Sequence, residues 1–167
     1  MKARRVIDRI LESLVIIVMS VLVVDVVWNV AARYLLNAPS SFSVELASFL
    51  LIWVGMLGAA YATGQKEHIA IELFPQWLEK KNPKQKRKLD HIINFLIILF
   101  AFFVLIIGGI KLVFIVFKLN QVSATMQIPM GIVYLCLPIS GALIIFYAVH
   151  EMIFGLPEHI RKKQEKE

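Results

Sequence analysis

The stretch "SFSVELASFLLIWVGMLGAAYATGQKEHIAIELF" (Ser41–Phe74) decides the fold class of this chain. Its apolar part, Val44–Gly64, carries one charged residue, Glu45, and is long enough to cross about 30 Å of bilayer hydrocarbon. A helix satisfies its backbone polar groups internally, which a segment in lipid requires. Three further runs of this kind occur in the chain, at Ile10–Leu36, Ile92–Phe117 and Gly131–Phe154. We therefore predict an all-α integral membrane protein in which residues 1–167 form a single domain of four transmembrane helices.

The positions of lysine and arginine predict the orientation in the membrane. These residues gather before the first run, between the second and third runs, and in the tail after the fourth. The connection before the second run has none, and the connection before the fourth run has only Lys118. By the positive-inside rule, both termini and the central loop are cytoplasmic. The net charge of +6 therefore reflects topology and anionic lipid, and it gives no reason to expect a nucleic-acid partner.

The central loop contains a segment, at about residues 70–81, with the pattern of an amphipathic helix. Its apolar face carries a tryptophan and lysines lie opposite, which suits a helix lying among lipid headgroups. The alternative is an ordinary amphipathic turn that packs on the ends of the spanning helices. The residues of the apolar face are Leu73, Phe74, Trp77 and Leu78.

Charged side chains inside the predicted spans are costly, so each needs a partner or a role. Arg33 ends the first span and Glu45 begins the second, and a short loop joins them. We expect an ion pair between Arg33 and Glu45 that fixes the two helices together. Asp25 is the expected partner of Lys111 in the third span, because a long lysine stem covers a modest difference in depth. Alternatively, the Lys111 side chain extends to the periplasmic headgroups.

The small residues of the second run predict a surface for close helix packing. Gly55, Ala59 and Thr63 are spaced four apart and therefore share one helical face. Trp28 and Trp53 lie within the spans, where they face lipid or anchor another protein. In the fourth run Pro138 removes a backbone hydrogen bond, so we expect a bend there.

The sequence contains no set of residues that fits a catalytic or cofactor site. The lone cysteine, Cys136, cannot form an intrachain disulfide, which excludes a membrane disulfide oxidoreductase. The four histidines lie at or beyond the predicted cytoplasmic helix ends, which does not suit bis-histidine haem ligation across a bundle. We predict a protein that is not an enzyme and binds no metal or other cofactor.

Several motifs together resemble the small membrane subunit of tripartite ATP-independent periplasmic (TRAP) transporters, the DctQ-like family. That family typically shows an arginine ending the first helix, an acid opening the second, and then a Gly-Ala segment. A histidine-containing acidic motif follows, and later a proline and a Leu-Pro pair. Many members have two adjacent acids at the start of the second helix, whereas this chain has Val44-Glu45. The matching positions are Arg33, Glu45, His68, Glu72, Pro129 and Pro138.

The resemblance implies a non-catalytic subunit of a sodium-coupled transporter in the bacterial inner membrane. Such a subunit supports a large membrane subunit, which carries the sodium and substrate sites, and helps a periplasmic binding protein to dock. The imported substrate is an organic acid, such as a dicarboxylate, a sialic acid or a sugar acid. The alternative is a self-sufficient homodimeric exporter that uses Asp25 or Glu45 as its proton-coupled site.

Overall fold

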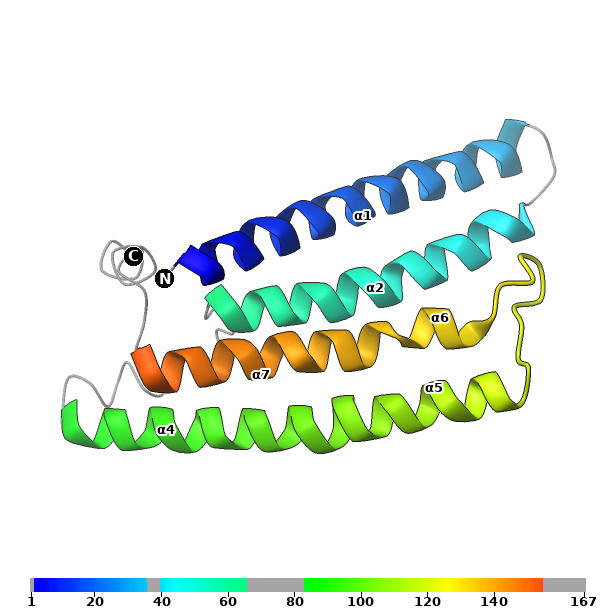
Figure 1. Ribbon diagram of the computed structural model, residues 1–167. Helices are drawn as coiled ribbons and strands as arrows, with labels where there is room; N and C mark the ends of the chain where they lie inside the picture. Colours follow the sequence, from blue (N-terminus) through cyan, green and yellow to red (C-terminus); the bar gives the residue numbers. More distant parts are fainter. Residues whose placement is uncertain (1, 36–39, 66–82, 155–167) are drawn as a thin grey trace.

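The computed structural model describes residues 2–35, 40–65 and 83–154 (Figure 1). The first two spans are single helices, α1 (Lys2–Leu35) and α2 (Ser41–Gln65). The third combines α4 (Pro83–Phe100), the π-helix η1 (Ala101–Gly108) and α5 (Gly109–Lys118). The fourth combines α6 (Met130–Tyr134) and α7 (Cys136–Phe154). Four segments are long and apolar enough to cross a membrane, which confirms the predicted all-α fold with four spanning helices.

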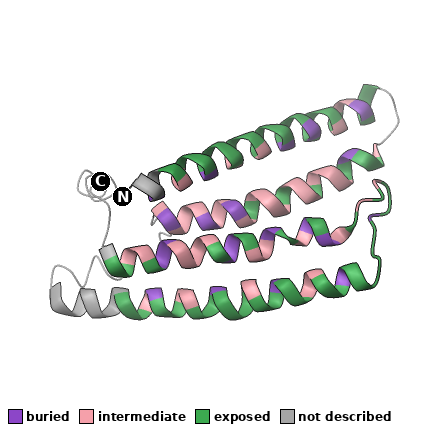
Figure 2. Ribbon diagram, viewed as in Figure 1, coloured by how far each residue is buried: buried purple, intermediate pink, exposed green. Residues whose placement is uncertain are grey.

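The spans stand side by side in an open row rather than a closed bundle (Figure 1). α1 packs on α2, α2 packs on α7, and α7 packs on α4 and η1. Helix packing therefore follows the order of the row, although side chains of α1 and α7 also meet at one end. Figure 2 shows exposed residues mainly along the two outermost spans, α1 and α4–α5, while α2 and the fourth span are mostly half-buried or buried. These exposed side chains are largely apolar, as a lipid or another membrane protein requires.

The contact between α1 and α2 is a narrow seam in which burial follows a heptad spacing. Buried or half-buried positions alternate by three and four residues, which is the pattern of two helices packed along their length. Nearly all other positions of α1 after its first turns are exposed; Val24, for example, is 69% exposed. The seam positions are Arg4, Asp8, Leu11, Val15, Val18, Leu22, Asp25, Asn29 and Ala32.

The fourth span is interrupted where a bend was expected. α6 ends at Tyr134 and α7 begins at Cys136, because Pro138 has no N–H to donate to the carbonyl of Tyr134. The third span packs closely against this interruption. A Cβ atom on Gly109 would lie 3.0 Å from Cβ of Leu137, and one on Gly141 would lie 2.8 Å from Cβ of Leu105. Glycine at both positions thus permits close packing beside the π-helix.

The predicted amphipathic helix at about residues 70–81 lies outside the described residues, as do His68 and Glu72 of the family motif.

Candidate functional site

Polar contacts concentrate at the two ends of the row. We call the end that holds the start of α1 and the end of α7 the terminal end, and the opposite end, with the connection between α5 and α6, the loop end (Figure 1).

Arg4 is the centre of the contacts at the terminal end. Its side chain is 4% exposed, and its Nη2 donates a hydrogen bond of 2.6 Å to the carbonyl of Gly64 at the end of α2. Its Nη1 lies 3.3 Å from Nδ1 of His150 on α7. Burying a guanidinium is costly unless its donors find acceptors, and here Nη1 and Nη2 find them while the buried Nε has no hydrogen-bond partner. Arg4 therefore joins α1 to both α2 and α7.

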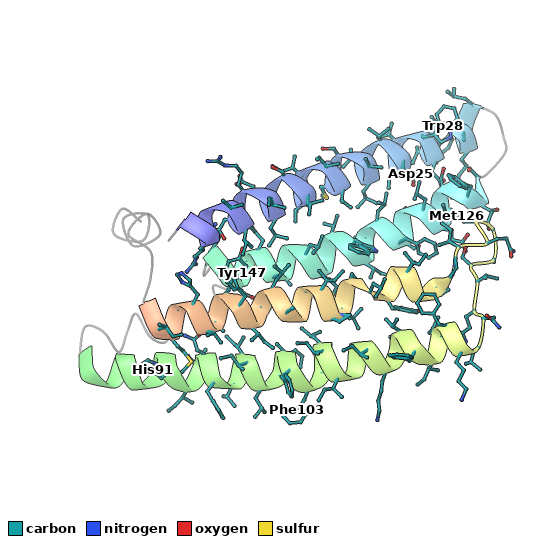
Figure 3. The ribbon with its side chains drawn as sticks, in the orientation of Figure 1. Asp25, Trp28, His91, Phe103, Met126 and Tyr147 are labelled. Atoms are coloured by element: carbon teal, nitrogen blue, oxygen red, sulfur yellow. The ribbon has the colours of Figure 1, made fainter. Side chains whose placement is uncertain are left out.

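Tyr147 of α7 adds a second connection at this end (Figure 3). Its hydroxyl donates a 2.7 Å hydrogen bond to Oδ1 of Asp8, while Oδ2 of Asp8 lies 3.9 Å from Nε of Arg4. The Arg4 guanidinium also lies 5.5 Å from the Tyr147 ring centroid, within cation–π range. A Cβ atom on Gly64 would lie 2.9 Å from the ring, so glycine makes room for the tyrosine. We call Arg4, Asp8, Gly64, Tyr147 and His150 the terminal cluster.

An apolar group lies directly beneath the terminal cluster and supports it. Leu11, Leu57 and Ala60 are each at most 4% exposed and pack with the Tyr147 ring. The third span is joined at the same end, where Nδ2 of Asn94 donates to Oε1 of Glu151 at 3.1 Å.

Glu45 organises the loop end through backbone contacts. Its carboxylate accepts hydrogen bonds from three successive N–H groups, those of Ala124 at 2.9 Å, Thr125 at 3.0 Å and Met126 at 2.8 Å. Hydrogen bonds to an ionised carboxylate are stronger than neutral ones. Glu45 therefore fixes the start of α2 to the connection between α5 and α6. We call this contact the loop clamp.

The connection is itself shaped to present those three N–H groups. Ser123 N donates to Ile128 O at 2.9 Å, and Met130 N donates to Gln121 O at 2.9 Å, so the chain turns back on itself. Asn120 and Gln127 have φ values of 48° and 54°, in the left-handed region that favours asparagine, aspartate and glycine. Figure 3 shows Met126 beside the start of α2.

The structure gives Glu45 partners other than the expected Arg33. Arg33 is exposed, and within the described residues the ion pair that forms is Arg4–Asp8. The backbone N–H groups satisfy the carboxylate without a second charge having to leave water, which removes the need for Arg33 there.

The expected contact between Asp25 and Lys111 also does not form. Asp25 is 9% exposed and lies in the seam with α2, while Lys111 is exposed on α5. α1 and α5 lie at opposite edges of the row, with α2 and the fourth span between them (Figure 1). The Asp25 Oδ2 atom has no hydrogen-bond partner.

The small-residue face of α2 is open in this chain. A Cβ atom on Gly55 or Gly58 would meet nothing within 4 Å, and Thr63 satisfies its hydroxyl on the carbonyl of Ala59 at 2.8 Å. Of the two tryptophans, Trp28 is 58% exposed and Trp53 packs against the apolar group beneath the terminal cluster. Trp53 is therefore a packing residue within the chain, whereas Trp28 faces outward.

The described residues do not assemble a reaction centre. Among them, no group of three or more histidine, cysteine, aspartate or glutamate side chains could hold a metal ion. Cys136 is fully buried. Several serine and threonine hydroxyls within the spans bond to carbonyls of their own helix, as Ser48 does to Val44 O at 2.9 Å. The polar contacts hold helices together.

Comparison with known families identifies the chain. Residues 22–157 match the family described as Tripartite ATP-independent periplasmic transporters, DctQ component. The chain belongs to this family. It is therefore a component of a transporter and not an enzyme, and with four spanning helices it is a multi-pass inner membrane protein.

Three relatives are named as parts of TRAP transporters. The sialic acid small permease protein SiaQ of Vibrio cholerae is 33% identical over 78 residues, which are 47% of this chain and 45% of SiaQ. A putative small permease protein of Haemophilus influenzae is 28% identical over 138 residues, 83% of this chain and 82% of the relative. The sialic acid permease protein SiaT of H. influenzae is 30% identical over 83 residues, which are 50% of this chain but 13% of SiaT.

Sequence reasoning missed most of the residues that connect the helices. Arg4 was counted only among the basic residues before the first run and Asp8 was given no role, although their four-residue spacing continues the apolar heptad of the first span. That continuation was a usable signal. Nothing in the sequence pattern singled out Tyr147 or Asn94, because their partners are distant in the chain.

Proposed function

We propose that this chain is the small, non-catalytic membrane subunit of a sodium-coupled TRAP transporter that imports an organic acid. The single observation that carries the proposal is the family match over residues 22–157, in a chain whose polar groups serve helix–helix contacts. Sodium and substrate bind on the large membrane subunit, and this chain needs no cofactor. Two relatives are named for sialic acid, which makes it the first substrate to test, before dicarboxylates and sugar acids.

The chain acts as a scaffold beside the large subunit. SiaT supports this role, because the stretch similar to this chain is a small part of a much longer permease chain. An open row of helices suits a scaffold, since both of its faces and both of its edges are available for contact. The terminal cluster and the loop clamp hold that row in one shape without occupying those faces.

We place the terminal end on the cytoplasmic side and the loop end on the periplasmic side. The distribution of lysine and arginine along the sequence supports this orientation. The connection held by the loop clamp then faces the periplasm, where Leu119 and Val122 are 62% and 49% exposed. This fixed surface contributes to docking of the periplasmic substrate-binding protein.

Uptake by purified components tests the proposal. Liposomes containing the large subunit with and without this chain receive binding protein, labelled sialic acid and an inward sodium gradient. We expect uptake only when both membrane subunits, the binding protein and sodium are present. Transport by liposomes that contain this chain alone would contradict the proposal and favour the homodimeric exporter.

A variant of the periplasmic surface tests the docking role separately. Leu119→Glu places a charge on the exposed surface without touching the loop clamp. We expect the binding-protein concentration needed for half-maximal uptake to rise while the maximal rate is kept. An unchanged concentration dependence would place docking elsewhere.

A further inference from the structure

Three polar side chains on the loop half of α1 have no partner among the residues that the structure describes. Asp25, Asn29 and Arg33 are spaced four apart and pass gradually from the seam to the surface, being buried, half-buried and exposed. Among the described residues, none of the three takes part in a hydrogen bond or an ion pair. We call them the α1 polar stripe. Figure 3 shows Asp25 near the loop end of the helix, on the side toward α2.

Asp25 is the costly member of this stripe. It lies ten residues before Leu35, which corresponds to about 15 Å of helix from the end of the span. Its Oδ2 atom is buried and has no donor. A carboxylate at membrane depth without a donor or a counter-ion weakens the chain that carries it.

Among the described residues, no cation is placed to satisfy Asp25. α2 is the helix against which α1 packs, and it contains no lysine, arginine or histidine. Arg33 is two turns away, about 12 Å along the same helix. Lys111 lies at the opposite edge of the row. Because Asp25 lies within the span, a cation on a neighbouring transmembrane helix would suit its position.

Asp8 shows what a satisfied aspartate in the same seam looks like. It also faces the α2 side of α1, but it accepts the Tyr147 hydroxyl at 2.7 Å and lies 3.9 Å from Nε of Arg4. At the terminal end the fourth span reaches α1 through these contacts. At the depth of Asp25 no third helix of this chain does so, because α1 there packs on α2.

We infer that Asp25 docks a transmembrane helix of the large permease subunit, and that this helix carries a lysine or arginine at the depth of Asp25. The inference rests on the proposed function. The docked helix lies along the α1–α2 seam. It contacts α1 near Asp25 in the way that the fourth span contacts α1 at the terminal end. Asn29 hydrogen-bonds the same helix, and Arg33 pairs with an acidic group nearer its periplasmic end. The required cation excludes a lipid phosphate as the partner of Asp25.

The test compares the stability of the isolated chain with its retention in the complex. Asp25→Leu places in the seam the residue type already found at Leu11 and Leu22, and Asp25→Asn keeps the shape of the side chain. Each variant is purified alone for thermal unfolding, and is co-expressed with the large subunit of its own transporter for co-purification. Glu12→Leu, which removes an exposed acid from the same helix, is the control.

We expect Asp25→Leu to raise the stability of the isolated chain and to lower its retention by the large subunit. Asp25→Leu should raise the unfolding midpoint of the isolated chain, because it removes an unsatisfied buried carboxylate. The same change should lower retention by the large subunit at least about tenfold, because it leaves the partner's cation unpaired. Asp25→Asn should also weaken retention, and Glu12→Leu should change neither measurement. Asp8→Asn should lower the midpoint of the isolated chain, since Asp8 has its donors.

Other results would overturn the inference in distinguishable ways. Retention of Asp25→Leu at the wild-type level would show that the large subunit does not use Asp25. A lower midpoint for both Asp25 variants would make Asp25 a structural residue of this chain. Dissociation of a wild-type homodimer by Asp25→Leu would make a second copy the occupant. If wild-type chain is not retained at all, the proposed function itself fails.

Discussion

The two ends of α1 contrast in how they are joined to the rest of the molecule. At the terminal end, Arg4 and Asp8 connect α1 to both α2 and α7. Toward the loop end, α1 packs on α2, and Asp25, Asn29 and Arg33 have no partners among the described residues. The loop end as a whole is nevertheless ordered, because Glu45 ties α2 to the connection before α6. Polar contacts between helices therefore hold the row at its two ends, whereas the α1 polar stripe makes no such contact with the described residues.

Removing the central cation of the terminal end should have the largest effect on stability. Arg4→Leu leaves the Asp8 carboxylate without its neighbouring charge and the Gly64 carbonyl without its donor. Loss of one partner from a buried charged group typically costs about 3–5 kcal/mol. Reversible unfolding of the isolated chain in mixed micelles measures this change. Arg9→Leu, at an exposed position one turn away, is the control and should change stability little.

Breaking the loop clamp should have a smaller and more local effect. Glu45→Gln removes the charge and turns an amide group toward backbone N–H donors, at a cost of about 1.5–3 kcal/mol. Hydrogen exchange of the amides at 124–126 should therefore become at least about tenfold faster. Exchange near Arg4 and Tyr147 should stay the same. Equal loss of protection at both ends would show that the two ends are not independent.

Removing a single hydroxyl from the terminal cluster should cost less. Tyr147→Phe keeps the ring that packs against Gly64 and Leu57 but removes the donor to Asp8. We expect a loss of about 1–2 kcal/mol, because a buried carboxylate oxygen is left unpaired. The measurement is again unfolding of the isolated chain. A value near zero would indicate that water or Arg4 replaces the hydroxyl.

Arg33 should matter least to the isolated chain. Arg33→Gln changes an exposed side chain that has no partner in the described structure, so stability should change by less than about 0.5 kcal/mol. Comparison with Glu45→Gln tests the pairing first expected from sequence. If the two residues paired, both variants would lose similar stability and the double variant would lose no more than either alone.

The sequence predicted the elements better than their contacts. The apolar runs identified all four spans, and the proline of the fourth run marked the interruption before Cys136. Both expected ion pairs were derived from depth along the membrane normal, which hydropathy provides. Depth leaves open which helices are neighbours in the membrane plane. Lys111 and Asp25 were placed together on that basis, and the order of helices in the row separates them.

A second error came from leaving backbone N–H groups out of the search for a partner of Glu45. Glu45 was assigned a charged partner because charged side chains are visible in a sequence. The three N–H groups that bind it come from Ala124, Thr125 and Met126, and every non-proline residue has such a group. Only the folded turn between Val122 and Pro129 brings them together on one carboxylate.

The sequence by itself determined that this chain has four apolar runs, each long enough to span the membrane. The spans follow from residue type and run length, because a segment in lipid has to satisfy its backbone polar groups internally and therefore forms a helix. The tertiary structure decided that the helices form an open row, that Arg4 and Glu45 hold its two ends, and that Asp25 has no partner among the described residues. These depend on contacts between residues far apart in the chain, which lateral packing alone brings within hydrogen-bonding distance.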